Sequence, residues 1–105
     1  MGYFTTISTA KAKPGKEKEL EELFLKVDAR AAQLPGLLNA QTFRQQDSPN
    51  TYWFVSTWES EEANMLAILE NEDLRTLVKQ TIPLFETRPE VGIKMDVLSS
   101  HGVAF

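Results

Sequence analysis

A chain of 105 residues has room for one folded domain with one hydrophobic core. Hydrophobic residues make up 42% of the sequence and charged residues 25%, which predicts a globular rather than a disordered protein. The sequence has no cysteine, which excludes disulfides, thiolate metal sites and a cysteine nucleophile. The net charge of −4 and the lack of a basic cluster argue against a nucleic-acid partner.

The sequence gives no sign of a membrane partner or of export. No stretch approaches the roughly 20 apolar residues that span a bilayer. The first residues lack a basic segment followed by an apolar run, which is the pattern of a signal peptide. We therefore expect a cytoplasmic protein.

The first third of the chain predicts a strand followed by an amphipathic helix. Residues 3–10 are rich in threonine, isoleucine and aromatic residues, and both faces of such a strand are partly polar. The strand could line a cavity, although threonine is also simply a good strand former. After a break at residues 13–15, apolar residues recur at spacings of three and four as far as Leu34.

Residues 37–46 and 51–59 predict a β-hairpin joined by the turn at residues 47–50. The second of these strands is apolar on both faces, so both faces need cover. We expect helices to cover one face and a second subunit to cover the other. We place on the bare face the residues Tyr52, Phe54, Trp58 and Ile7, with Trp58 as an anchor of the subunit interface.

A second helical region and a last strand complete the chain. Ser60 predicts a helix N-cap, and residues 71–73 predict a break before a second helical segment that Pro83 limits. Residues 90–98 alternate between apolar and other residues, which predicts a half-buried strand. The inward positions of this strand are Val91, Ile93, Met95 and Val97.

The predicted order is strand, helix, strand, strand, helix in two pieces, strand. This is the βαββαβ order of the ferredoxin-like α+β class, a four-stranded antiparallel sheet with its helices on one face. We expect one domain over residues 1–105, with a core of about 3–98 and a short tail at 99–105. A sheet face without helices would be a large apolar patch, so we expect a homodimer through that open face.

Four short runs resemble the antibiotic biosynthesis monooxygenase family: residues 13–16 (KPGK), 34–38 (LPGLL), 52–54 (YWF) and 58–63 (WESEEA). The resemblance covers about residues 3–98. It implies a dimeric α+β barrel. It also implies an oxidoreductase that uses O₂ to oxidise a small aromatic quinol or polyketide-like substrate with no cofactor and no metal.

A related branch of that family degrades haem with an asparagine, a tryptophan and a histidine. This sequence has Ser8, Ala67 and Leu77 at the matching positions, so haem degradation is not expected. The single histidine, His101, lies in the tail and is interpreted as an exposed side chain. The second helical region also lacks the histidine of many relatives, which leaves the chain without an evident base.

Two residues are candidate catalytic groups. Ser8 could handle a proton, directly or through water, and Trp58 could stack on an aromatic ring or hold an oxyanion with its indole N–H. The candidate substrate-binding residues are Phe4, Thr6, Val27, Arg44, Val55 and Leu66. The apolar members are equally consistent with a plain core, and Arg44 with an ion pair to Asp47 or to a glutamate of the partner chain.

Two functions therefore stay open. One is a cofactor-independent monooxygenase, and the other is a non-catalytic ligand-binding or accessory domain on the same dimeric scaffold. The fold does not decide between them.

Overall fold

The structure is a computed structural model that describes residues 3–87 and 92–102. Within these residues the chain forms strands and helices in the order expected from the sequence. The elements are β1 (Phe4–Lys11), α1 (Glu17–Ala31), β2 (Leu37–Gln45), β3 (Ser48–Trp58), α2 (Glu61–Glu70), α3 (Glu72–Thr81), the 3₁₀ turn η1 (Ile82–Leu84) and β4 (Ile93–Asp96).

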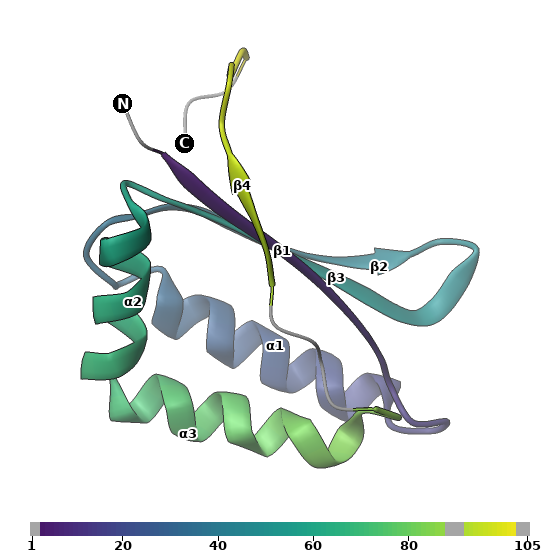
Figure 1. The fold of residues 1–105 in the computed structure, drawn as a ribbon. Helices are drawn as coiled ribbons and strands as arrows, with labels where there is room; N and C mark the ends of the chain where they lie inside the picture. The colour runs from purple at the N-terminus through teal and green to yellow at the C-terminus, as the bar shows by residue number, and fades with distance from the viewer. Residues whose placement is uncertain (1–2, 88–91, 103–105) are drawn as a thin grey trace.

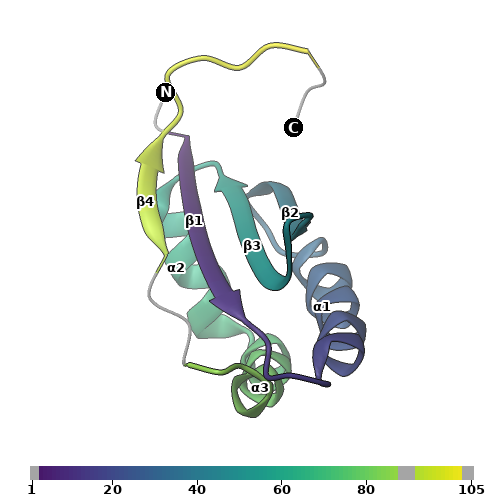
Figure 2. The ribbon, with the colours of Figure 1, turned by 90° about the vertical axis from the view of Figure 1, so that its right-hand side faces the viewer.

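The four strands form one antiparallel sheet with the order β2-β3-β1-β4. The three α-helices lie on the same face of this sheet (Figures 1 and 2). The ferredoxin-like α+β fold is thus confirmed. The last strand is shorter than predicted, and the part of the prediction that falls on residues 88–91 lies outside the described residues.

Local sequence signals set the limits of the helices. The Ser60 side chain accepts a hydrogen bond from the backbone N–H of Ala63 at 3.1 Å, which caps the start of α2. Asn71 adopts an extended conformation between α2 and α3, and its side chain donates to the Ala67 carbonyl at 2.8 Å. The predicted break between the two helical pieces is confirmed. Pro83 lies in the 3₁₀ turn that ends the helical region.

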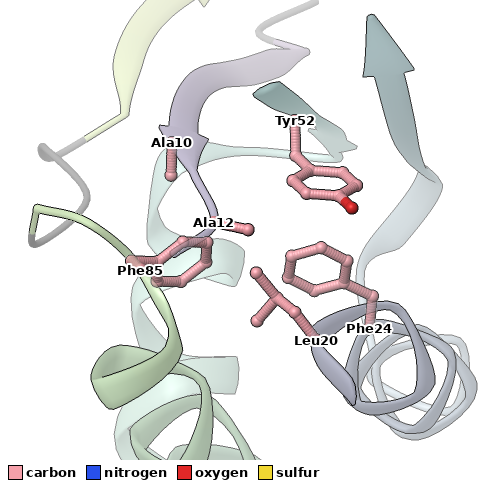
Figure 3. Close-up of a cluster of buried hydrophobic side chains, with 6 residues drawn as sticks. All are labelled: Ala10, Ala12, Leu20, Phe24, Tyr52 and Phe85. Atoms are coloured by element: carbon pink, nitrogen blue, oxygen red, sulfur yellow. The ribbon is translucent and has the colours of Figure 1, made fainter. Parts of the chain in front are cut away.

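The buried side chains form two clusters at opposite ends of the helix-side face of the sheet. The first contains Ala10, Ala12, Leu20, Phe24, Tyr52 and Phe85, and Figure 3 shows their rings and methyl groups pointing toward one another. The second contains Phe4, Leu34, Trp58, Ala67 and Leu74. Between the clusters, the same face of the sheet carries Thr6 opposite Ser56 and Ser8 opposite Phe54.

The predicted assignment of the sheet faces is wrong. Tyr52 and Trp58 are 1% and 4% exposed and pack on the helix side, so Trp58 is not placed to anchor a subunit interface. Ile7 pairs with Val55 and therefore faces away from Phe54. The alternation of a strand gives two faces but does not tell which of them the helices cover.

The sheet face away from the helices carries a different set of apolar side chains. In register, Phe43 lies beside Trp53, and Ile7 lies between Val55 and Ile93. Ile93 and Met95 are 61% and 40% exposed, which corrects the expectation that they point inward. Val97 is half-buried, and Val91 lies outside the described residues.

Residues 97–102 extend beyond the sheet with no helix or strand (Figure 2). None of the helices in residues 3–87 and 92–102 has the length and apolar character that a membrane span requires.

Candidate functional site

A cavity of about 700 Å³ lies between the helix-side face of the sheet and the three helices. It occupies the region between the two buried clusters, and its size is in the range of small-molecule sites. Apolar side chains from every neighbouring element line it. They include Phe4 and Phe54 from the sheet, Val27 and Ala31 from α1, and Met65, Ile68, Leu74 and Val78 from α2 and α3.

Three side chains with polar groups are joined on the sheet side of this cavity. The hydroxyls of Thr6 and Ser56 lie 2.9 Å apart, and the Trp58 indole N–H donates to the Ser56 hydroxyl at 3.0 Å. Ser8 follows Thr6 on the same face, and its hydroxyl has no hydrogen-bond partner among the described residues. The cavity therefore offers a free hydroxyl beside a small hydrogen-bonded network, a suitable surface for a substrate oxygen.

A carboxylate from helix α1 also lines the cavity, and it is not among the site residues predicted from the sequence. Asp28 lies on α1, and the Thr42 hydroxyl donates to its Oδ2 atom at 2.9 Å. Burial raises the pKa of Asp28 above its usual value, and the hydrogen bond from Thr42 opposes that rise. Its position in the sequence could have identified it, because Asp28 follows Phe24 by four residues and so lies on the apolar face of the helix.

Cationic side chains gather along the rim of the cavity. Lys94 of β4 pairs with Glu61 at the start of α2 at 2.6 Å, and both side chains are well exposed. The Arg75 guanidinium donates to the carbonyl oxygens of Ile68 and Leu69 at the end of α2. Lys79 lies one turn further along α3. Three cations and one acid thus surround an apolar interior, which favours a ligand that carries or develops negative charge.

A second, smaller hollow of about 330 Å³ adjoins the cavity and shares Asp28 and Thr42 with it. Here the carboxylate of Glu21 accepts hydrogen bonds from the Tyr52 hydroxyl at 2.6 Å and from Arg44 at 2.9 Å. These contacts lower the pKa of Glu21. Burial, and then the Glu21 carboxylate, raise the pKa of Tyr52 well above its usual value. Both groups are therefore held in their neutral-pH forms, with Tyr52 protonated and Glu21 ionised.

The structure brings most of the predicted site residues together. Phe4, Thr6, Ser8, Val27 and Trp58 all line the larger cavity. Val55 is also part of the lining, although its register places its side chain on the opposite face of the sheet.

Two predicted substrate-binding residues do not reach this cavity. Arg44 lies in the smaller hollow and pairs with Glu21, not with Asp47. Leu66 is absent from the lining and is 45% exposed. Helix α2 is apolar on every side, so its sequence pattern does not identify the inward residues.

The described residues contain no group of three histidine, aspartate or glutamate side chains that could hold a metal ion. His101 is exposed in the tail. Its position there agrees with the expectation that it is a surface side chain.

The fold resembles that of several solved proteins. A protein from Chloroflexus aurantiacus, a candidate antibiotic biosynthesis monooxygenase, superposes with a TM-score of 0.82 at 18% identity over 98% of this chain and 100% of that chain. A candidate monooxygenase of the same kind from Caulobacter crescentus gives 0.83 at 23% identity, over 93% and 92% of the two chains. A mutant form of SnoaB, a cofactor-independent oxygenase from Streptomyces nogalater, gives 0.82 at 19% identity, over 95% and 97%.

These likenesses establish the fold, and the sequence comparison establishes the family. No curated protein sequence matches the chain. The family model described as antibiotic biosynthesis monooxygenase matches residues 4–80, which include β1 to α2, most of α3 and most of the cavity. The chain therefore belongs to the antibiotic biosynthesis monooxygenase family.

Proposed function

We propose that the protein is a monooxygenase that oxidises a planar quinol or polyketide-like aromatic with O₂ and without a cofactor. The observation that carries this proposal is the apolar cavity of about 700 Å³ with its hydroxyl and indole groups on one wall and a carboxylate on another. The family supports a monooxygenase, and the lining supports an aromatic substrate with a few oxygen atoms.

The reaction balances without a cofactor because the substrate supplies the electrons. An anthrone methylene and one O₂ give a quinone carbonyl and one water. The first step is loss of a proton from the hydroxyl of a quinol, or of the enol form of an anthrone, which gives an electron-rich anion. This anion then passes an electron to O₂. The apolar lining of the cavity limits the contact of the radical and peroxide intermediates with water.

Ser8, Thr6 and Trp58 have distinct roles in this proposal. The free Ser8 hydroxyl donates to a substrate oxygen, and Thr6 extends the same polar wall. The Trp58 ring is a flat wall against which an aromatic substrate can lie. Its N–H already donates to Ser56, so it stabilises an oxyanion by giving up that bond.

We also propose that the protein works as a homodimer through the sheet face away from the helices. Phe43 and Trp53 are 44% and 38% exposed on that face, and Ile93, which pairs with Ile7, is 61% exposed. Apart from Lys11 at the end of β1, the adjacent polar positions carry uncharged side chains, for example Thr9, Asn39 and Gln41. Such a surface is better suited to a self-complementary interface than to water.

One observation favours the alternative, a ligand-binding domain without turnover. The Trp58 N–H, the Ser56 hydroxyl and the Thr6 hydroxyl satisfy one another, so this wall is stable without a substrate. Ligand binding without O₂ uptake would support this alternative.

The test is protein-dependent O₂ uptake by the metal-free protein with a panel of naphthoquinols and anthrones. We expect saturable uptake in the wild type, and a loss of at least about tenfold in kcat for Ser8→Ala and Trp58→Phe. Trp53→Phe, which alters the other tryptophan on the opposite sheet face, is the matched control and should keep the activity. Equal activity in all three variants would place the reaction outside this cavity.

A further inference from the structure

Asp28 is the carboxylate that faces the cavity without a cationic partner in the described part of the chain. It lines both the cavity and the smaller hollow beside it. Glu61, on the rim, pairs with Lys94, and Glu21, in the hollow, is held by Tyr52 and Arg44. An ionised carboxylate among apolar side chains carries an energetic penalty, so it requires an explanation.

The contacts of Asp28 fix one of its oxygen atoms and leave the other free. Oδ2 accepts the hydrogen bond from Thr42 at 2.9 Å. Oδ1 has no hydrogen-bond partner among the described residues. Every fully buried side-chain oxygen in those residues has a partner, so Oδ1 is not fully buried. Oδ1 is therefore open to whatever occupies the cavity or the hollow. A carboxylate held through one oxygen and open at the other is arranged as a hydrogen-bond acceptor for a ligand.

We propose that Asp28 is the catalytic base that takes the proton from the substrate hydroxyl, and that Thr42 positions it. The substrate O–H bond breaks, an O–H bond forms at Oδ1, and the electron pair stays on the substrate oxygen as a phenolate. The proton later leaves with the water that is formed from O₂. This inference rests on the proposed monooxygenase function and supplies the base that the missing histidine left unassigned.

The surrounding charges favour this proton transfer. Besides Asp28, the charged and titratable groups that line the cavity and the hollow are Glu21, Arg44, Tyr52, Glu61, Arg75, Lys79 and Lys94. Transfer neutralises the carboxylate inside the wall and moves the negative charge to the substrate. The rim cations Arg75 and Lys79 stabilise that charge. Burial raises the pKa of Asp28 and so makes it a stronger base than an exposed aspartate. Its pKa is thereby closer to that of the substrate hydroxyl that it deprotonates.

The first test compares Asp28→Asn and Thr42→Val with Asp47→Asn, a control in an exposed turn where Asp47 contacts Gln45. For Asp28→Asn we expect kcat to fall by about 100-fold or more with little change in KM. The acid limb of the kcat/KM profile should disappear as well. Thr42→Val should move that limb to higher pH, because the hydrogen bond from Thr42 lowers the pKa of Asp28 and its loss lets that pKa rise. A purely structural role for either residue would not move the limb.

Full activity in a folded Asp28→Asn protein would overturn the proposal while leaving the monooxygenase function intact. If the wild type has no activity on the panel, the monooxygenase proposal fails, and binding then tests Asp28 separately. The probes are 1-naphthol and its methyl ether, with tryptophan fluorescence as the readout. We expect the wild type to bind 1-naphthol about tenfold more tightly than the methyl ether, because only the naphthol can donate a hydrogen bond to Asp28. Asp28→Leu should bind both equally, and equal affinities in the wild type would contradict the role of Asp28.

Discussion

Gly36 joins two of the four segments that carry the family resemblance, residues 34–38 and 58–63. It has a φ of +83°, and its carbonyl accepts the backbone N–H of Glu59 at 2.8 Å. A Cβ atom at this position would lie 2.7 Å from the Cβ of Ala63. The Pro35-Gly36 turn and the corner at residues 58–63 therefore form one structural joint. Because these motifs build this joint, they identify the fold and say little about the reaction.

Replacement of Gly36 by alanine should lower the free energy of unfolding. A non-glycine residue in the left-handed region costs about 1 to 3 kcal/mol, and the contact with Ala63 adds to this loss. Gly15→Ala is the matched control, because Gly15 has the same φ of +83° with no atom within 4 Å of its Cβ position. Urea unfolding should show the larger loss at Gly36. Equal losses at the two glycines would show that packing against Ala63 contributes nothing.

Asp28 should destabilise the folded protein at neutral pH. Its pKa is raised in the folded state, so the folded chain binds a proton more readily than the unfolded chain. The Asp28 contribution to stability is thus complete below the unfolded value of 3.8 and declines as the pH rises through the raised folded value. We expect Asp28→Asn to melt at a higher temperature than the wild type at pH 7, with a smaller advantage near pH 3. A lower melting temperature at pH 7 would contradict this account of the carboxylate.

Helix α2 covers the cavity, and its start depends on one side chain. Ser60 caps the helix through Ala63, and no single apolar face orients the helix, because its apolar residues are spread over every side. We expect Ser60→Ala to cost about 1 kcal/mol of stability and Ser60→Asp to retain most of it. Thermal unfolding of the two variants checks this expectation. Equal loss in both would mean that the cap hydrogen bond is not what Ser60 contributes.

The sequence predicts the helices and strands better than it predicts which face of each strand the helices cover. The Ser60 cap, the break at Asn71 and the hairpin follow from local chemistry, and the structure has all three. Local chemistry does not show which face of β3 the helices cover. Tyr52 and Trp53 point to opposite faces, and both are large and aromatic, so only the packing of the helices distinguishes the two faces.

The candidate site shows the same division between local and long-range information. Ser8 and Thr6 were identifiable because a strand with hydroxyls on both faces is unusual for a core. The importance of Asp28 depends on Thr42, 14 residues away on β2, and no local pattern links them. Leu66 lies outside the cavity lining, and the sequence does not reveal this because periodicity is uninformative on a helix that is apolar on every side.

At the scale of the whole molecule, the sheet face away from the helices should be an interface between two copies of this chain. We expect a dimer by light scattering at micromolar concentration, because the Phe43–Trp53 and Ile7–Val55 pairs leave an apolar surface. Trp53→Lys should shift the mass toward the monomer. Leu66→Lys, at an exposed apolar position on α2, is the control and should remain dimeric. A monomeric wild type would remove the interface from the account.

The most direct test of the central claim is isotope labelling of the metal-free wild-type protein with ¹⁸O₂ and an anthrone, followed by mass spectrometry of the product. The cavity, its hydroxyl wall and Asp28 lead us to expect one labelled oxygen atom per product, formed faster than in the protein-free control. Product formation at the spontaneous rate, or product oxygen derived from water, would contradict the claim that this cavity carries out monooxygenation.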